Sequence, residues 1–308
     1  MGYKRAGFKV LGNCEIDPEM NEVYVKNNHP KYNFLMDLRD FNELNSIPDE
    51  LKNLDILDGS PPCSVFSTCG DREKAWGKEK IFREGQKKQR LDDLFFVFLD
   101  TVAKLQPKVV VAENVTGLIK GNAKGYVNSI IKRFKQLGYS VQMFQLNSAL
   151  MNVPQVRERI FFIANKCNFP KLKLSFSEKP IFFGEVRTPH GISVSGKKSK
   201  YYISKMKNTD MDFSDVRLRI DGKHSNFSSK IVWDDRIAPT LVSGSDFLRG
   251  YDKSWYSEED CRNIQTFPQD YDFCGKSAKY ICGMSVPPNM MANIASEIYK
   301  QWFNPAKT

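Results

Sequence analysis

The alternation of short apolar runs with helical patterns along residues 1–165 constrains the fold most strongly. Apolar runs occupy residues 8–12, 54–58 and 109–112, and helical patterns separate them. The β-branched run at 109–112 is typical of a strand buried on both faces of a parallel sheet. Strands that alternate with helices predict an α/β fold, namely a doubly wound, mostly parallel sheet with helices on both faces.

The composition changes after residue 165. Between residues 166 and 235, Pro and Gly break the chain into short pieces that are rich in Lys, Ser and Tyr. Helical patterns return at 257–265 and 289–302. We therefore expect a first domain at 1–165, a smaller domain of strands and loops at 166–235, and a C-terminal part, 236–308, that returns to the first domain.

The net charge of +10 comes from two segments. Residues 71–90 hold eight basic and four acidic residues, and residues 166–235 hold fourteen and eight. This distribution favours a polyanionic partner, although a solvated lysine-rich surface would give the same count. Because the sequence has neither a membrane-length apolar run nor a signal-peptide pattern, we expect a soluble, cytoplasmic protein with no membrane partner.

A cysteine and a carboxylate follow two of the expected strands. Cys63 stands in a Pro-Pro turn after the run at 54–58, and Glu113 follows the run at 109–112. Because the carboxyl ends of parallel strands share one edge of a sheet, a thiol and a carboxyl group would meet there. A buried core cysteine and an ion-paired glutamate are the simpler alternatives. Seven irregularly spaced cysteines and three histidines give no ligand pattern, so we expect no metal site.

Two arginines alternate in an extended segment. Gln155, Arg157 and Arg159 occupy every second position, so their side chains can project from one face. Paired guanidinium groups suit an oxo group or a phosphate, whereas a charged edge strand would explain them without a ligand.

The order of these motifs carries more information than any one of them. The chain presents Pro-Pro-Cys, Glu-Asn-Val, Gln-x-Arg-x-Arg, a basic insert, Gln-Thr-Phe-Pro and Gly-Met-Ser-Val-Pro-Pro, at residues 61–63, 113–115, 155–159, 166–235, 265–268 and 283–288. This order closely resembles the cytosine-5 DNA methyltransferase family. The resemblance implies a Rossmann-like class I methyltransferase fold with a target recognition domain at 166–235. It also implies methylation of carbon 5 of a cytosine that is flipped out of a specific duplex sequence.

The resemblance implies a role for each catalytic position. The Cys63 thiolate adds to carbon 6 of cytosine, and Glu113 serves N3 as a proton-holding carboxyl group. Arg159 holds the cytosine O2 with Arg157 beside it, and Asn114 shapes the loop. Residues 64–90 resemble the loop that closes over DNA.

The resemblance also implies a methyl donor, S-adenosylmethionine, which leaves as S-adenosylhomocysteine. Glu15 matches the acid that bonds the ribose hydroxyls, and Ile16 would pack on the adenine. Asp37 matches the acid that recognises the adenine amino group, and Leu38 follows it. The residues that would line the methionine end are Pro62, Leu94, Ser285 and Val286.

Two departures from the family pattern stand out. The family begins with a strand and a Phe-x-Gly-x-Gly turn, whereas this chain begins after that turn. We therefore expect a fragment, a separate polypeptide that supplies the motif, or an impaired protein. Met284 stands where the family usually has Asn.

Three functions stay open at this point. A DNA (cytosine-5-)-methyltransferase of a prokaryote or phage is favoured, acting near the nucleoid as a monomer on duplex DNA, with or without a companion restriction enzyme. A tRNA cytosine-5 methyltransferase is the close alternative, but the recognition segment lacks the Cys-Phe-Thr signature expected for it. A catalytically inactive DNA-binding remnant is the third.

Overall fold

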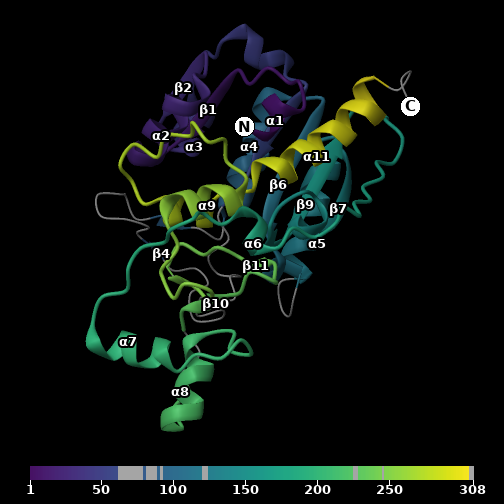
Figure 1. The fold of residues 1–308 in the computed structure, drawn as a ribbon. Coiled ribbons are helices and arrows are strands. Elements are labelled where there is room, and N and C mark those ends of the chain that lie inside the picture. Colours follow the sequence, from purple (N-terminus) through teal and green to yellow (C-terminus); the bar gives the residue numbers. More distant parts are fainter. Residues whose placement is uncertain are drawn as a thin grey trace. The chain divides into compact units, whose positions relative to one another are not determined.

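The chain folds into two compact units (Figure 1). The computed structural model describes residues 1–61, 79–80, 89–90, 93–119, 124–224, 228–244 and 246–304. We call the first unit the sheet unit, which comprises residues 10–146, 158–174 and 297–308. The second, the insert unit, comprises residues 1–9, 147–157 and 175–296.

The sheet unit contains most of the longer strands. Its strands are β1 (Gly12–Glu15), β2 (Tyr32–Leu35), β3 (Ile56–Gly59), β4 (Glu79–Lys80), β5 (Gln89–Arg90), β6 (Val109–Val115), β7 (Ser140–Asn147) and β9 (Glu158–Asn165). Its helices are α2 (Pro18–Asn28), α3 (Leu38–Glu43), α4 (Leu94–Leu105) and α5 (Lys124–Gln136), with 3-10 turns η1 (Asp49–Asn53) and η2 (Thr116–Ile119) and a π-helical turn at Tyr299–Phe303. This order confirms the strand–helix alternation predicted from the sequence.

The central sheet has the order β3-β6-β9-β7. Strand β3 runs parallel to β6, and β9 runs antiparallel to β6. Strands β1 and β2 form a separate parallel pair, and β4 and β5 a short antiparallel one. In the β6–β9 register Glu113 lies opposite Phe161, and Val115 lies opposite Arg159. The carboxyl end of β6 and the beginning of β9 therefore meet at one edge of the sheet.

Local sequence explains where α2 begins. The Asp17 side chain accepts hydrogen bonds from the backbone N–H groups of Glu19 and Met20, and Pro18 occupies the first helical position. The predicted helix at residues 18–28 is confirmed. The first strand is shifted, since the sequence suggested residues 8–12 and the structure has Gly12–Glu15. Phe8 instead packs edge-on against the ring of Tyr3 in the insert unit.

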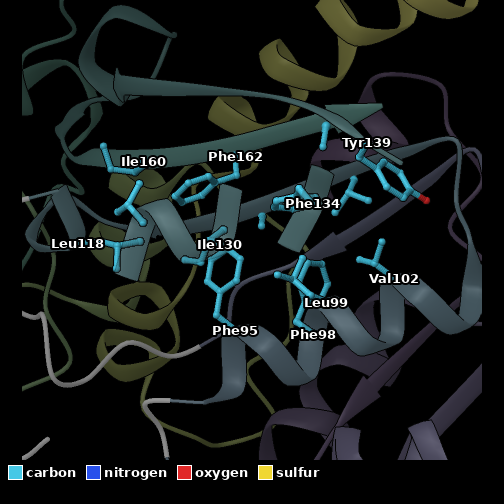
Figure 2. Close-up of a cluster of buried hydrophobic side chains, with 14 residues drawn as sticks. Phe95, Phe98, Leu99, Val102, Leu118, Ile130, Phe134, Tyr139, Ile160 and Phe162 are labelled. Carbon is cyan, nitrogen blue, oxygen red and sulfur yellow. The ribbon is translucent and has the colours of Figure 1, made fainter. Parts of the chain in front are cut away.

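An aromatic core joins α4 and α5 to the central sheet. Figure 2 shows the side chains of Phe95 and Phe98 from α4 turned toward this cluster, together with Phe134 and Tyr139. Phe95 makes an edge-to-face contact with Phe162 of β9, with ring centroids 5.4 Å apart. Burial of this apolar surface fixes the helices on the sheet and so fixes the strand ends that carry the candidate site.

The insert unit is built from short helices and short strands. Its helices are α1 (Gly2–Arg5), η4 (Ser148–Leu150), α6 (Phe183–Val186), α7 (Lys197–Ser204), α8 (Phe213–Asp221), α9 (Glu258–Gln265), α10 (Ala278–Met284) and α11 (Pro288–Ile298, whose last residues belong to the sheet unit). Its strands are β8 (Gln155–Val156), β10 (Lys230–Val232), β11 (Ala238–Pro239) and β12 (Phe247–Arg249). Strands β10 and β12 pair in parallel, as do β8 and β11.

The segment at 166–235 contains more helix than its sequence suggested. Helices α7 and α8 pack against each other, as Figure 1 shows. Asp212 begins α8 with a capping box, and Gly222 ends it in the left-handed conformation that glycine adopts without strain. The insert unit is also larger than the segment at 166–235, because residues 1–9, 147–157 and 236–296 belong to it.

Among the residues that the structure describes, no helix is long and apolar enough to cross a membrane.

Candidate active site

An ion pair between β6 and β9 marks the candidate catalytic edge. Arg159 Nε lies 2.9 Å from Glu113 Oε1, and the two side chains are only 14% and 12% exposed. Burial lowers the pKa of the Arg159 guanidinium, and the neighbouring Glu113 offsets only part of this shift. The pair therefore places one carboxyl group and one guanidinium group, both largely shielded from water, at the edge of the sheet where β6 ends and β9 begins.

The neighbouring Asn114 holds the backbone at Pro61, two residues before the candidate nucleophile in the sequence. Its buried side chain donates a hydrogen bond from Nδ2 to the carbonyl oxygen of Pro61 at 3.1 Å. Its Oδ1 accepts one from the backbone N–H of Val115 at 2.9 Å. Pro62 and Cys63 lie outside the described residues, which end at Pro61 in this part of the chain.

A close approach also fixes the end of β3. A side-chain carbon on Gly59 would meet the ring of Phe98 at 2.3 Å. Only glycine lets β3 pack this tightly on α4, and the turn at Pro61 follows directly.

Two carboxylates stand at the carboxyl ends of the β1–β2 pair. Glu15 is the last residue of β1 and lies opposite Leu35, and Asp37 follows β2 by two residues. Glu15 accepts a hydrogen bond from the backbone N–H of Asp17. Burial raises the pKa of Glu15, although this hydrogen bond acts in the opposite direction. Asp37 accepts the backbone N–H of Arg39 as the N-cap of α3. Both acidic side chains therefore lie at the same end of the β1–β2 pair in the sheet unit.

The apolar candidates of this unit lie around those acids. Ile16 and Leu38 are half-buried, and Leu94 at the beginning of α4 is buried. Leu35 is 48% exposed, so apolar surface faces outward beside Glu15. Carboxylates beside apolar surface suit a nucleoside, whose hydroxyl and amino groups donate hydrogen bonds and whose base stacks.

The other predicted positions lie in the insert unit. Ser285 and Val286 are half-buried, and Ser285 donates from its hydroxyl to the carbonyl oxygen of Ile281 at 2.5 Å. Met284, at the position that departs from the family pattern, is 52% exposed.

Arg157 has a different environment from Arg159. It is 2% exposed and donates to the carbonyl oxygens of Leu241 and Gly283 at 3.0 and 2.9 Å. The boundary between the two units falls between Arg157 and Glu158. The alternation of residues 155–159 therefore does not place both guanidinium groups at one sheet edge within one unit.

Sequence reasoning missed the role of Gln265. Its side chain is fully buried and hydrogen-bonded to Gln155 and to the backbone of Ser285. The signal was available in part, because Gln265 begins the Gln-Thr-Phe-Pro motif. A buried amide cannot be distinguished from a surface one by spacing alone.

The sequence matches the model of a known protein family. Residues 1–236 match the model of the C-5 cytosine-specific DNA methylases. The chain belongs to this family. Its members are DNA (cytosine-5-)-methyltransferases, a family that uses S-adenosylmethionine as methyl donor, so the predicted family and enzyme class are confirmed.

Relatives of this methylase occur in bacteria and phages. The Type II methyltransferase M1.HphI of Haemophilus parahaemolyticus is 28% identical over 97% of this chain and 83% of its own length. The Type II methyltransferase M.NgoMIV of Neisseria gonorrhoeae is 32% identical over 60% of the chain and 55% of its own length. The orphan methyltransferase M.Rho11sI of Bacillus phage rho11s is 32% identical over 51% of the chain, which spans 28% of that relative.

Solved structures share the fold of the methylase over nearly its whole length. A prophage-encoded E. coli protein described as a DNA modification methyltransferase has a TM-score of 0.71 at 19% identity, covering 97% of this chain and 94% of its own. A DNMT2 variant of Spodoptera frugiperda has a TM-score of 0.64 at 15% identity, with coverages of 97% and 95%. The predicted Rossmann-like methyltransferase fold is confirmed.

Proposed function

We propose that this methylase transfers a methyl group to carbon 5 of a flipped cytosine through a covalent adduct with Cys63. The observation that carries the proposal is the buried Glu113–Arg159 pair beside Asn114, whose side chain holds the carbonyl oxygen of Pro61. Cys63 comes two residues after that anchored position. Attack of a thiolate on carbon 6 would divide one difficult substitution into easier steps.

The Glu113–Arg159 pair supplies groups for two neighbouring atoms on one edge of the base. Cytosine presents an acceptor at O2 and another at N3, and the guanidinium of Arg159 can donate to O2. A bond from Glu113 to N3 needs a proton on one of the two atoms. We therefore propose that one proton is shared between Glu113 and N3 as negative charge builds on the ring.

The donor set at the β1–β2 edge fits S-adenosylmethionine. The methyl donor supplies an activated methyl group when it is bound. Glu15 would accept hydrogen bonds from the ribose, and Asp37 would accept one from the adenine amino group. Ile16, Leu38 and Leu94 would exclude water from the apolar parts of the ligand, and Pro62, Ser285 and Val286 would line its methionine end.

The insert unit would hold the DNA through its basic surface. Lys197, Lys198 and Lys200 are exposed on α7. Exposed lysines suit phosphate contacts, which position a protein on DNA without reading its sequence. The segment at 166–235 is proposed as the target recognition domain, between a catalytic part at 1–165 and a returning part at 236–308. Because one chain supplies both the basic surface and the catalytic edge, we propose a monomer that acts beside the DNA of a prokaryotic cell.

The proposal is tested by trapping the adduct. Duplex DNA whose cytosines carry fluorine at carbon 5 has no proton there to release, so the enzyme cannot leave the ring after methyl transfer. In the presence of S-adenosylmethionine we expect a complex that survives denaturing gel electrophoresis. Cys63→Ala should form none while still binding the unmodified duplex. A trapped complex with fluorinated tRNA alone would favour the tRNA alternative, and duplex binding without S-adenosylhomocysteine binding would favour the inactive remnant.

A further inference from the structure

A chain of buried amide groups runs through the insert unit. The Oε1 of Gln155 accepts the backbone N–H of Leu241 at 2.8 Å, and its Nε2 donates to Gln265 Oε1 at 2.7 Å. The Nε2 of Gln265 then donates to the carbonyl oxygen of Ser285 at 2.7 Å. Both glutamine side chains are 0% exposed. The chain thus links residue 241, which follows β11, to the end of α10.

Arg157 makes a second connection between the same two segments. Its two terminal nitrogens donate to the carbonyl oxygens of Leu241 and Gly283 at 3.0 and 2.9 Å. Leu241 therefore bonds through its N–H to Gln155 and through its carbonyl oxygen to Arg157. Because β8 carries Gln155 and immediately precedes Arg157, one short segment fixes both ends of the network.

The two linked segments are also in close backbone contact. A side-chain carbon on Gly283 would lie 2.5 Å from the backbone nitrogen of Ser243 and 2.8 Å from the carbonyl carbon of Val242. Residues 283–285, which are the last two residues of α10 and its C-cap, therefore rest on the backbone of residues 242–243. Five hydrogen bonds and this close approach leave the network little freedom to shift.

We infer that Gln155, Gln265 and Arg157 are positioning residues that hold residues 283–285, at the end of α10, in the shape that binds the methyl donor. This inference rests on the proposed function, which gives Ser285 and Val286 a place at the methionine end of the donor. A ligand-binding segment that is ordered before binding loses less conformational entropy when the ligand binds. Loss of the network should therefore weaken donor binding more than it slows the chemical step.

Gln265 is the best residue to test because its side chain donates directly to the carbonyl oxygen of Ser285. Gln265→Met keeps the length of the side chain but removes its donor and acceptor atoms. The matched control is Asn263→Leu on the same helix, α9, whose amide donates to the carbonyl oxygen of Val186 at 2.8 Å, far along the chain from residues 283–285. Both changes remove an amide-to-carbonyl hydrogen bond, so thermal unfolding measures their common effect on stability.

The decisive readout is the dissociation constant of S-adenosylhomocysteine, measured by calorimetry. For Gln265→Met we expect it to rise about tenfold, and for Asn263→Leu less than about twofold. The Michaelis constant for S-adenosylmethionine should rise with it, while kcat on duplex DNA stays within about threefold of the original.

Each other outcome has a definite meaning. An unchanged dissociation constant for Gln265→Met, or equal increases in the two variants, would overturn the inference. If the original protein binds neither S-adenosylhomocysteine nor DNA, the proposed function itself fails and the inference with it. If Gln265→Met does not fold, hydrogen exchange of the original protein decides. The N–H of Leu241 should then be protected before ligand is added, and rapid exchange there would overturn the inference.

Discussion

The Nε atom of Arg159 lies 2.9 Å from Oε1 of Glu113, between a strand end and a strand beginning that are paired in antiparallel register. The register fixes this pairing, because Arg159 stands opposite Val115 and Glu113 stands opposite Phe161. The two charged groups are therefore held by the sheet rather than by flexible loops. Such a rigid placement suits groups that must meet a base at defined edges.

Replacement of Glu113 tests the role of the carboxyl group. Glu113→Gln keeps the size of the side chain but cannot share a proton with N3. We expect methyl transfer to fall about 100-fold or more, in the range of lost acid–base catalysis, with duplex binding retained. The measurement is initial rate at saturating donor, together with a gel-shift assay. A rate within a few-fold of the original would remove Glu113 from the chemistry.

Replacement of Asn114 tests the anchoring of the nucleophile turn. Asn114→Ala leaves the carbonyl oxygen of Pro61 without its donor, and we expect a stability loss of about 1–3 kcal/mol for the broken buried hydrogen bonds. The turn should also hold Cys63 less well, so the trapped adduct should form more slowly. Urea unfolding and the rate of trapping measure the two effects. Normal trapping in a destabilised variant would leave Asn114 a purely structural residue.

The burial of Glu15 predicts a pH-dependent stability. Because burial raises the pKa of Glu15, the folded protein binds the proton more tightly than the unfolded chain does. The resulting stabilisation is complete below the ordinary pKa of about 4.3 and is lost as the pH rises through the folded-state value. Glu15→Gln should therefore raise the melting temperature at neutral pH, and the gain should shrink toward acid pH. Melting curves across pH check this, and a gain that grows as the pH falls would reverse the assignment.

The same Glu15→Gln variant should bind S-adenosylhomocysteine more weakly. The amide offers the ribose hydroxyls one acceptor atom in place of two. Greater stability with weaker binding would identify Glu15 as a residue kept for the ligand. Unchanged affinity would place the ribose elsewhere.

A buried ion pair in the insert unit predicts a large stability effect. Arg249 and Asp260 are both 0% exposed and 3.2 Å apart, and Arg249 also donates to Thr188. Asp260→Asn removes the buried charge partner of Arg249 and leaves it Asp252, 2.7 Å away and 27% exposed, so we expect a loss of about 3 kcal/mol in the free energy of unfolding, at the lower end for a broken buried pair.

The control for this prediction is an exposed pair. Lys31 and Glu50 lie 2.6 Å apart with side chains 51% and 46% exposed. Glu50→Gln should lower the free energy of unfolding far less than Asp260→Asn does, since water screens the exposed pair. Urea unfolding of both variants gives the comparison. Equal losses would show that burial of the Arg249 pair adds nothing.

Sequence periodicity predicted the regular elements well and the sites of contact less well. The strand at Val109 and the helix at 18–28 follow from local composition and capping, so they could be predicted. Phe8 reads as a strand residue, but its contact with Tyr3 holds it in the other unit. The spacing of apolar residues does not determine such tertiary contacts.

The candidate site shows the same division. Strand ends in one sheet must meet, so the motifs predicted that Cys63 and Glu113 share a sheet edge, and Cys63 lies outside the described residues. The family resemblance assigned Glu113 and Arg159 to the same base, and the structure pairs their side chains. Alternation also suggested that Arg157 faces the same ligand, yet its guanidinium bonds to Leu241 and Gly283. Those carbonyl groups come from segments more than eighty residues away, as the separations of 84 and 126 positions show. Only the folded chain reveals such a partner.

The most direct test of the account is the identity of the methylated base. Duplex DNA is incubated with the protein and labelled S-adenosylmethionine, digested to nucleosides and separated, with tRNA treated in parallel and Cys63→Ala as the control. We predict that the label appears in 5-methylcytosine from DNA alone and disappears with Cys63→Ala. Label in an amino group of cytosine or adenine, or transfer that survives Cys63→Ala, would contradict the account.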